Sequence, residues 1–178
     1  MLARHVFSCH TDCRKEDQIL AVIFFSKEYG EDQLQYITSS NYDSLPSSND
    51  PEKRLKRQRE IIKLISSFST IIAPSSYHDY IKHQWNAHQN VPLWVSIKAM
   101  TFGNTSKMFS LCYSKIQSDV AKEFPNISAG ELAGMLDMLA LVRNVCAHNE
   151  RLYDFSVKNN RAIQDLPAHA ALGIAKTS

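Results

Sequence analysis

The stretch "SAGELAGMLDMLALVRNVCAHN", residues 128–149, decides the fold. Ser128 and Glu131 have the spacing of a capping box, so we expect a helix from near Ala129 to about Asn149. Its apolar residues trace one stripe, as a helix packed against other helices requires. These residues are Leu132, Met135, Leu136, Leu139, Val142 and Cys146. The stretch therefore predicts a long core helix that ends in polar residues.

The remaining segments also show helical patterns and no convincing alternating strand. We therefore predict an all-α fold, a helical bundle. The expected segments are a helix over 3–29 stopped by Gly30, a loop over 38–51, a helix over 52–72, a short helix or ordered loop over 76–89, and a helix over 93–118 that starts after Pro92 and is interrupted at Gly103.

Length and composition indicate a single folded domain over 1–178. Apolar residues make up 44% of the 178 residues, which is enough for a sizeable core. A net charge of +2 is compatible with a polyanionic ligand but does not by itself indicate one. The four cysteines do not have the spacing of a secreted disulfide framework. The sequence contains no evident signal peptide or membrane anchor, so we predict a cytoplasmic protein without membrane contacts.

Arg143, Asn144 and His148 lie at the end of the predicted last helix. Arg143 and His148 are separated by about 7.5 Å of rise and about 140° of rotation, so they can border one cleft from opposite flanks. Asn144 precedes His148 by four residues and can orient its imidazole from the same face. The alternative is that His148 only interacts with the helix dipole while Arg143 forms a surface ion pair.

These residue types suit metal-independent cleavage of RNA. That reaction needs a base for the ribose 2′-hydroxyl, an acid for the leaving 5′-oxygen and a cation for the phosphate. Histidine can serve as base and acid near neutral pH, and arginine binds phosphate oxygens through its planar fork. One helix supplies only one His and one Arg, whereas a two-fold homodimer doubles both. The chemistry therefore predicts a composite site at a dimer interface.

A second group of cations lies in the helix predicted over 52–72. It comprises Lys53, Arg54, Lys56, Arg57 and Arg59. One interpretation is a solvated helix face, and the other is a surface that binds the RNA phosphate backbone without sequence preference.

Three further groups have simpler interpretations. Cys9, His10 and Cys13 offer metal ligands, but no second Cys/His pair follows at zinc-finger spacing, so no metal and no cofactor is predicted. His78, His83 and His88 match no known ligand pattern and are predicted to be surface or loop residues. Four aromatic residues can either stack on bases or form core, and we favour core. They are Trp85, Trp94, Phe102 and Phe109.

Three segments together resemble the Abi-like (abortive infection) family of bacterial proteins, part of the HEPN superfamily. "RNVCAHNERLYDF", 143–155, resembles the hallmark of that family, an arginine followed by a histidine after four to six residues. "VPLWVSIKAMTFGNTSKMF", 91–109, is similar to the segment that precedes this motif. "FFSKEYGEDQLQYITSSNYD", 24–43, is similar to an earlier stretch of the same family.

The resemblance implies an α-helical HEPN bundle, usually dimeric through the motif-bearing helices. Many members are metal-independent endoribonucleases of phage defence or toxins, so RNA, a second copy and an RNA or protein antitoxin are the implied partners. Arg143 and His148 match the motif residues, and Asn144 matches the usual polar residue after the arginine. Asn149 and Arg151 also match, and we expect them to contact RNA.

Two departures from the family pattern bear on these expectations. Related proteins commonly have residues before the region that Met1–Val6 enters, so the chain either lacks a family-typical N-terminal segment or is a short member. Glu150 replaces the tyrosine that marks members controlled by a nucleotidyltransferase partner. The functions left open are an antiviral ribonuclease, a module that binds RNA or protein without cutting, and a structural helical adaptor.

Overall fold

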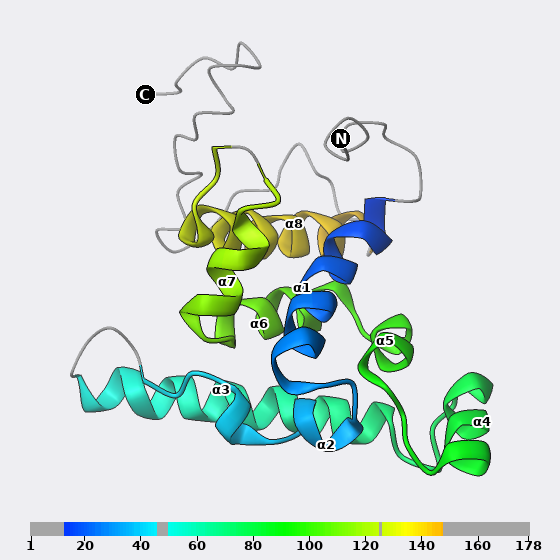
Figure 1. Ribbon diagram of the computed structural model, residues 1–178. Helices are drawn as coiled ribbons and strands as arrows, with labels where there is room; N and C mark the ends of the chain where they lie inside the picture. The colour runs from blue at the N-terminus through cyan, green and yellow to red at the C-terminus, as the bar shows by residue number, and fades with distance from the viewer. Residues whose placement is uncertain (1–12, 46–49, 125, 148–178) are drawn as a thin grey trace.

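The computed structural model describes residues 13–45, 50–124 and 126–147, and their regular structure consists of helices without a strand (Figure 1). This confirms the predicted all-α fold. In chain order the elements are α1 (Cys13–Tyr29), α2 (Gln33–Tyr36), the 3-10 helix η1 (Ser39–Asn41), α3 (Pro51–Ile71), α4 (Asp79–His88), α5 (Leu93–Ser96), the 3-10 helix η2 (Ile97–Ala99), α6 (Phe102–Leu111), α7 (Ser114–Ala121) and α8 (Ala129–Ala147).

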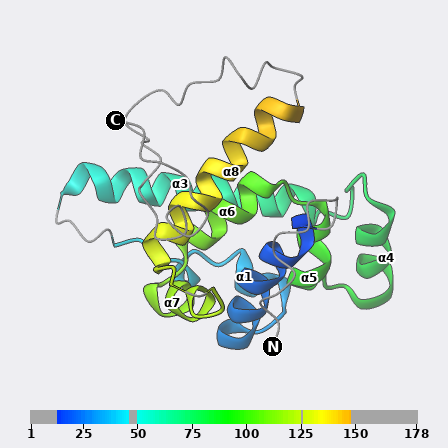
Figure 2. The ribbon, with the colours of Figure 1, turned by 90° about the horizontal axis from the view of Figure 1, so that it is seen from above.

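Helix α6 forms the centre of the bundle, because it packs against α1, α3 and α8. Helices α3 and α8 lie on opposite sides of it, along the bottom and the top of Figure 1. Helix α7 packs against both α1 and α8. Seen from above in Figure 2, α8 crosses α3 at a steep angle, and its C-terminal end extends beyond α6. This arrangement places Arg143 and Asn144 of the predicted motif near one projecting end of the bundle.

The core is built from large side chains that leave almost no surface in solvent. Phe25 of α1, Phe68 of α3 and Phe109 of α6 are each at most 1% exposed. Ile81 brings α4 onto the same cluster. Burial of each such side chain contributes about 1.5–3 kcal/mol to folding. The helices are therefore held by tertiary packing as well as by their own hydrogen bonds.

Two buried tyrosines join the segment after α1 to the segment before α5. The Tyr42 hydroxyl donates to the Tyr36 carbonyl oxygen at 2.7 Å, and the Tyr36 hydroxyl donates to the Val91 carbonyl oxygen at 2.5 Å. Nearby, the Val91 backbone N–H donates to the Gln33 side chain at 3.2 Å. Burial raises the pKa of both tyrosines well above the usual value. Their neutral hydroxyls thus serve as structural hydrogen-bond donors.

Several predicted helix ends are confirmed by their caps. The Asp50 side chain accepts from the Glu52 N–H at 2.9 Å, which starts α3 at Pro51, within one residue of the prediction. The Glu131 carboxylate accepts from the Ser128 N–H at 2.8 Å, as expected of a capping box. Gly30, with a φ of 94°, follows the end of α1 as predicted, because left-handed backbone is least strained at glycine.

The single helix predicted over 93–118 is wrong. The chain there forms α5, η2, α6 and the start of α7, with extended backbone at Met100 and Cys112 between them. The Thr101 hydroxyl caps α6 by accepting from the Asn104 N–H at 3.2 Å. Gly103 lies inside the first turn of α6 and does not interrupt a helix. The predicted loop over 38–51 likewise contains η1 and includes the first residue of α3.

Candidate functional site

Helix α8 projects beyond the helices on which it packs. Leu132 belongs to the common core, and Leu136 packs against it. Arg143 and Ala147 follow Leu136 at spacings of seven and eleven residues and so lie on the same side of the helix, yet both are exposed. Arg143 therefore faces solvent near the C-terminal end of α8, although Val145 in the same turn is only 6% exposed.

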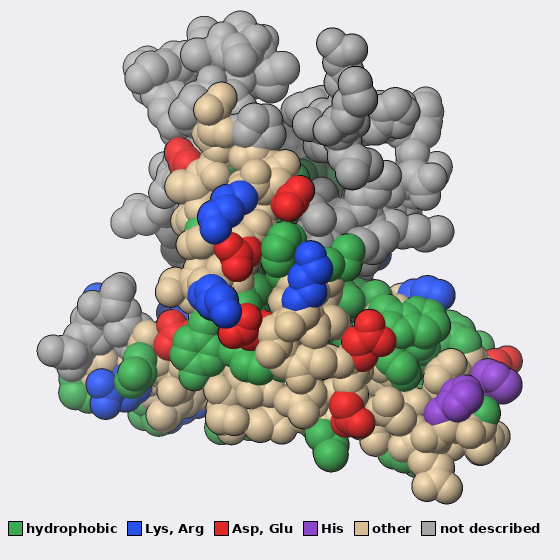
Figure 3. Space-filling model, viewed as in Figure 1, with side chains coloured by type: hydrophobic (Ala, Val, Ile, Leu, Met, Phe, Trp, Pro, Cys, Tyr) green, Lys and Arg blue, Asp and Glu red, His purple; other side chains and the backbone are tan. Residues whose placement is uncertain are grey.

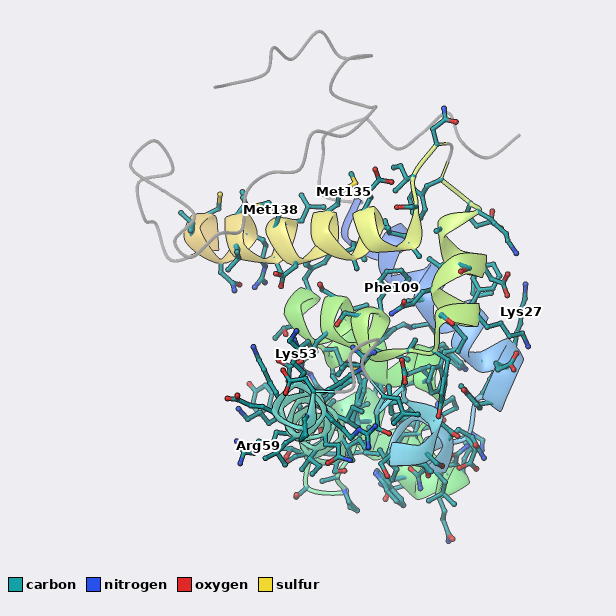
Figure 4. All side chains as sticks on the ribbon, turned by 90° about the vertical axis from the view of Figure 1, so that its left-hand side faces the viewer. Lys27, Lys53, Arg59, Phe109, Met135 and Met138 are labelled. Carbon is teal, nitrogen blue, oxygen red and sulfur yellow. The ribbon has the colours of Figure 1, made fainter. Side chains whose placement is uncertain are left out.

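Beside the residues that reach the core, α8 carries further apolar side chains, which we call the outer stripe. It consists of Met135, Met138, Leu139, Val142 and Cys146. Figure 4 shows Met135 and Met138 on the side of α8 that faces away from α6. Leu139 is 48% exposed, and Cys146 is also exposed. Of the predicted apolar stripe, only Leu132 and Leu136 reach the core, and its other residues form the outer stripe.

The polar end of α8 keeps Arg143 available to a ligand. Its Nη1 donates to the Asn144 Oδ1 at 3.4 Å, a long contact between neighbouring exposed side chains. Within the described part of the chain, Arg143 has no carboxylate partner. The surface ion pair considered from the sequence is thus not formed among these residues. A guanidinium in this state can bind an oxyanion bidentately.

The other predicted residues of the motif, His148, Asn149 and Arg151, lie outside the described residues. The hydrogen bond from Asn144 to His148 therefore stays a prediction, as do the RNA contacts of Asn149 and Arg151.

Helix α3 presents most of the predicted basic run to solvent. Lys53, Arg54, Lys56 and Arg59 are exposed, and within residues 13–45, 50–124 and 126–147 none of them forms an ion pair. Figure 4 shows Lys53 and Arg59 projecting from α3 on the side toward which the C-terminal end of α8 extends. This surface can bind a polyanion through charge alone.

Arg57 differs from its neighbours because it is bonded inside the fold. Its Nε donates to the Asp43 carbonyl oxygen at 2.5 Å, and its Nη2 donates to the Ser110 carbonyl oxygen at 3.2 Å. Gln117 donates to the same Ser110 oxygen at 3.1 Å. Together these groups satisfy free carbonyls at the C-terminal end of α6. The sequence contained a signal for this role, since Arg57 aligns at helical spacing with the buried Ile61.

We expect Arg57→Ala to lower the free energy of unfolding by about 1–3 kcal/mol, because it removes charge-assisted hydrogen bonds from partly buried carbonyls. Urea unfolding followed by far-ultraviolet circular dichroism measures the change. Arg59→Ala is the matched control and should change stability by less than about 0.5 kcal/mol, since Arg59 is exposed. Equal losses in the two variants would contradict the internal role of Arg57.

The predicted aromatic set belongs mainly to the core. Phe109 is buried, while Trp85 and Phe102 are half-buried. The Trp85 indole N–H also donates to the Ile72 carbonyl oxygen. Trp94 is the exception, because its ring is exposed and lies 5.3 Å from the Lys98 ammonium. One exposed ring does not make a stacking platform.

The histidines on and beside α4 lie at the surface, as predicted. His83 and His88 are exposed, and half-buried His78 contacts the ring of Tyr80 at 5.2 Å between centroids. Figure 3, which has the same view as Figure 1, shows histidine side chains in purple at the surface of the molecule. Among the described residues, no group of three His, Cys, Asp or Glu side chains is placed to hold a metal ion. The described helices also include none long and apolar enough to cross a membrane.

Comparison with protein families gives one informative result. A family model described as "Abi-like protein" matches residues 15–154, which include the whole of α3, α6 and α8. Comparisons with curated proteins and with solved structures gave no match to this chain. The match covers more than half of the chain and includes every residue of the predicted arginine–histidine motif.

Proposed function

This chain belongs to the Abi-like protein family, whose name refers to abortive infection, and on that basis we propose that it is a metal-independent endoribonuclease of phage defence. The observation that supports this most directly is the exposed guanidinium of Arg143. It lies at the projecting end of α8 and has no carboxylate partner among the described residues. We also propose that the helical bundle and the site are of the HEPN type.

In the proposed reaction the ribose 2′-oxygen attacks the phosphorus while the bond from phosphorus to the 5′-oxygen breaks. One His148 imidazole accepts the 2′-hydroxyl proton, and a second, protonated His148 gives a proton to the leaving 5′-oxygen. Arg143 stabilises the negative charge that builds on the phosphate. Asn144 orients the imidazole, and Arg151 and Asn149 hold the neighbouring RNA. The products are a 2′,3′-cyclic phosphate and a 5′-hydroxyl.

The need for two histidines leads us to propose a homodimer formed through the outer stripe of α8. A helix that is apolar on all sides is stable in water only when both sides are covered. In α8 the core covers Leu132 and Leu136, and a second α8 is the proposed cover of the outer stripe. Two-fold contact between these stripes with the two helices parallel would bring both Arg143 side chains to one end of the interface.

We expect Leu139→Glu to weaken dimerisation by about a hundredfold or more, because it places a charge in an apolar contact. Sedimentation equilibrium of the native chain and the variant measures the dimer dissociation constant. Leu34→Glu on α2 is a matched control, since Leu34 is 60% exposed but lies outside α8. A native chain that stays monomeric at micromolar concentrations would remove the composite site.

The exposed cations of α3 suit a secondary contact with the RNA backbone. Arg57 is left out of this contact because the fold uses its guanidinium. The contributing residues in this proposal are Lys53, Arg54, Lys56 and Arg59. Each phosphate that they neutralise should add roughly 0.7 to the slope of log affinity against log salt for a single strand.

Cleavage of a labelled single-stranded RNA in excess EDTA tests the proposed function. We expect cleavage to persist without divalent metal, to be absent on the matched DNA, and to be lost in His148→Ala. The DNA control is informative because it lacks the 2′-hydroxyl that attacks in this reaction. Cleavage that stops when EDTA is added, or that continues in His148→Ala, would overturn the proposed mechanism.

The alternative function is an RNA-binding protein that does not cut. The exposed cations of α3 favour this alternative, because they provide affinity without requiring the motif on α8. Binding that weakens steeply with salt, together with intact RNA after long incubation, would select it.

A further inference from the structure

Helix α3 carries apolar side chains on two sides. Ile61, Leu64 and Phe68 are at most 4% exposed and belong to the core. Leu55 is 47% exposed and Ile62 is 64% exposed. At about 100° per residue, Ile62 lies about 100° around the helix from Ile61 and about 160° from Leu64, so it faces solvent on the flank of the core side. Leu55 precedes Ile62 by seven residues and lies on nearly the same line.

Three cations flank this exposed line on one side of the helix. They are Lys56, Arg59 and Lys63, all exposed. In the described part of the chain none of them pairs with a carboxylate, and Glu60 pairs instead with Lys107 of α6 at 3.0 Å. We call the five residues Leu55, Lys56, Arg59, Ile62 and Lys63 the outer face of α3. It combines an apolar line with a row of free positive charge.

This combination restricts the ligand. RNA phosphates account for the cations but offer nothing apolar to Leu55 and Ile62. A second copy of the same face would oppose cation to cation, which is repulsive. A lipid surface would bury only two apolar side chains of α3, because the other apolar side chains of this helix already lie in or against the core. A helix with its own apolar line and an acidic flank complements both features.

We infer that the outer face of α3 docks an acidic amphipathic helix of a partner protein. Apolar side chains of that helix pack on Leu55 and Ile62, whose spacing is one heptad. Its carboxylates pair with Lys56, Arg59 and Lys63. Two of these cations, Lys56 and Arg59, are also proposed to bind RNA, so docking would block RNA. That last consequence rests on the proposed function, whereas the docking does not.

A synthetic helical peptide with leucines at heptad a and d positions and glutamates at e and g is the probe. The full chain is titrated into the labelled peptide, and fluorescence anisotropy reports binding. We expect the double variant Leu55→Ser, Ile62→Ser to bind at least about tenfold more weakly, because two apolar contacts are lost. Leu34→Ser is the control for an exposed leucine elsewhere, and it should bind like the native chain.

The same two serines should leave RNA affinity unchanged, because they alter no charge. The triple variant Lys56→Gln, Arg59→Gln, Lys63→Gln should weaken binding of the acidic peptide by about tenfold or more. A peptide with lysines at e and g should not bind. If the native chain binds the acidic peptide but no RNA, the docking stands and the proposed function fails.

Three results would overturn the docking. One is equal affinity of the native chain and the double serine variant for the acidic peptide. Another is equal affinity of the native chain for the acidic and the lysine peptides. The third is flotation with phosphatidylglycerol vesicles that requires Leu55 and Ile62 while the acidic peptide does not bind, which would assign the face to lipid. Circular dichroism of the double serine variant verifies in each experiment that its helical content is that of the native chain.

Discussion

Replacing Arg143 with alanine should lower the rate of RNA cleavage by about 100-fold to 1000-fold, the usual effect of losing one donor to a developing negative charge. The expectation follows from the exposed position of Arg143 at the end of α8. Single-turnover cleavage of a labelled RNA at saturating protein measures the chemical step directly. Arg143→Lys should recover part of the rate, because an ammonium keeps the charge but not the bidentate fork.

A matched variant separates this effect from general loss of charge. Arg54→Ala removes an exposed cation of α3, so it should weaken RNA binding and its salt dependence while the saturated rate stays near native. Both variants should keep native helical content, because neither arginine packs in the core. An Arg143→Ala protein that remains dimeric and cleaves at the native rate would exclude Arg143 from the reaction.

The sequence was most informative where local chemistry determines structure. The start of α3 follows from Asp50 before Pro51, and the start of α8 follows from Ser128 and Glu131, since each cap forms between residues a few positions apart. The end of α1 follows from Gly30 in the same way. These signals depend little on the rest of the fold, which is why they could be read without it.

Features set by neighbours in space could not be predicted in this way. The apolar pattern continues across the breaks at Met100 and Cys112 because the short helices on either side all face one core. Similarly, periodicity marks Leu139 as apolar but does not say which side of α8 meets α6. The role of Arg57 depends on the carbonyls of Asp43 and Ser110, which are distant in sequence.

The same division applies to the candidate site. The motif located Arg143 and Asn144 on one helix end, and the structure confirms that both are exposed there. What the sequence missed is that only Leu132 and Leu136 of the predicted stripe meet the core, whereas Leu139 and Cys146 stay exposed. His148 lies outside the described residues, so the pairing of an imidazole with this guanidinium remains a prediction.

Alkaline pH should destabilise this fold steeply. Burial raises the pKa of both Tyr36 and Tyr42 in the folded state, whereas in the unfolded chain both ionise near the ordinary value of 10.0. Above that pH the unfolded state therefore holds fewer protons, and stability falls as pH rises. Half of the unfolded tyrosines are already ionised at pH 10, so each tyrosine should cost about 1 kcal/mol between pH 10 and pH 11, and the pair about 2 kcal/mol. Urea unfolding at pH 9, 10 and 11 measures this slope.

Tyr42→Phe identifies the source of the slope. The variant keeps the buried ring but removes the ionisable hydroxyl and its 2.7 Å hydrogen bond, so it should be less stable at pH 8 yet lose about 1 kcal/mol less than the native chain between pH 10 and pH 11. Tyr77→Phe is the control for the same substitution at an exposed position, because Tyr77 is 93% exposed. Burial raises the pKa of Cys112 to about 12, which adds to the loss in all variants equally. An unchanged slope in Tyr42→Phe would mean that the folded state admits the tyrosinate, and the link from Tyr42 through Tyr36 to Val91 would then not hold the two segments together.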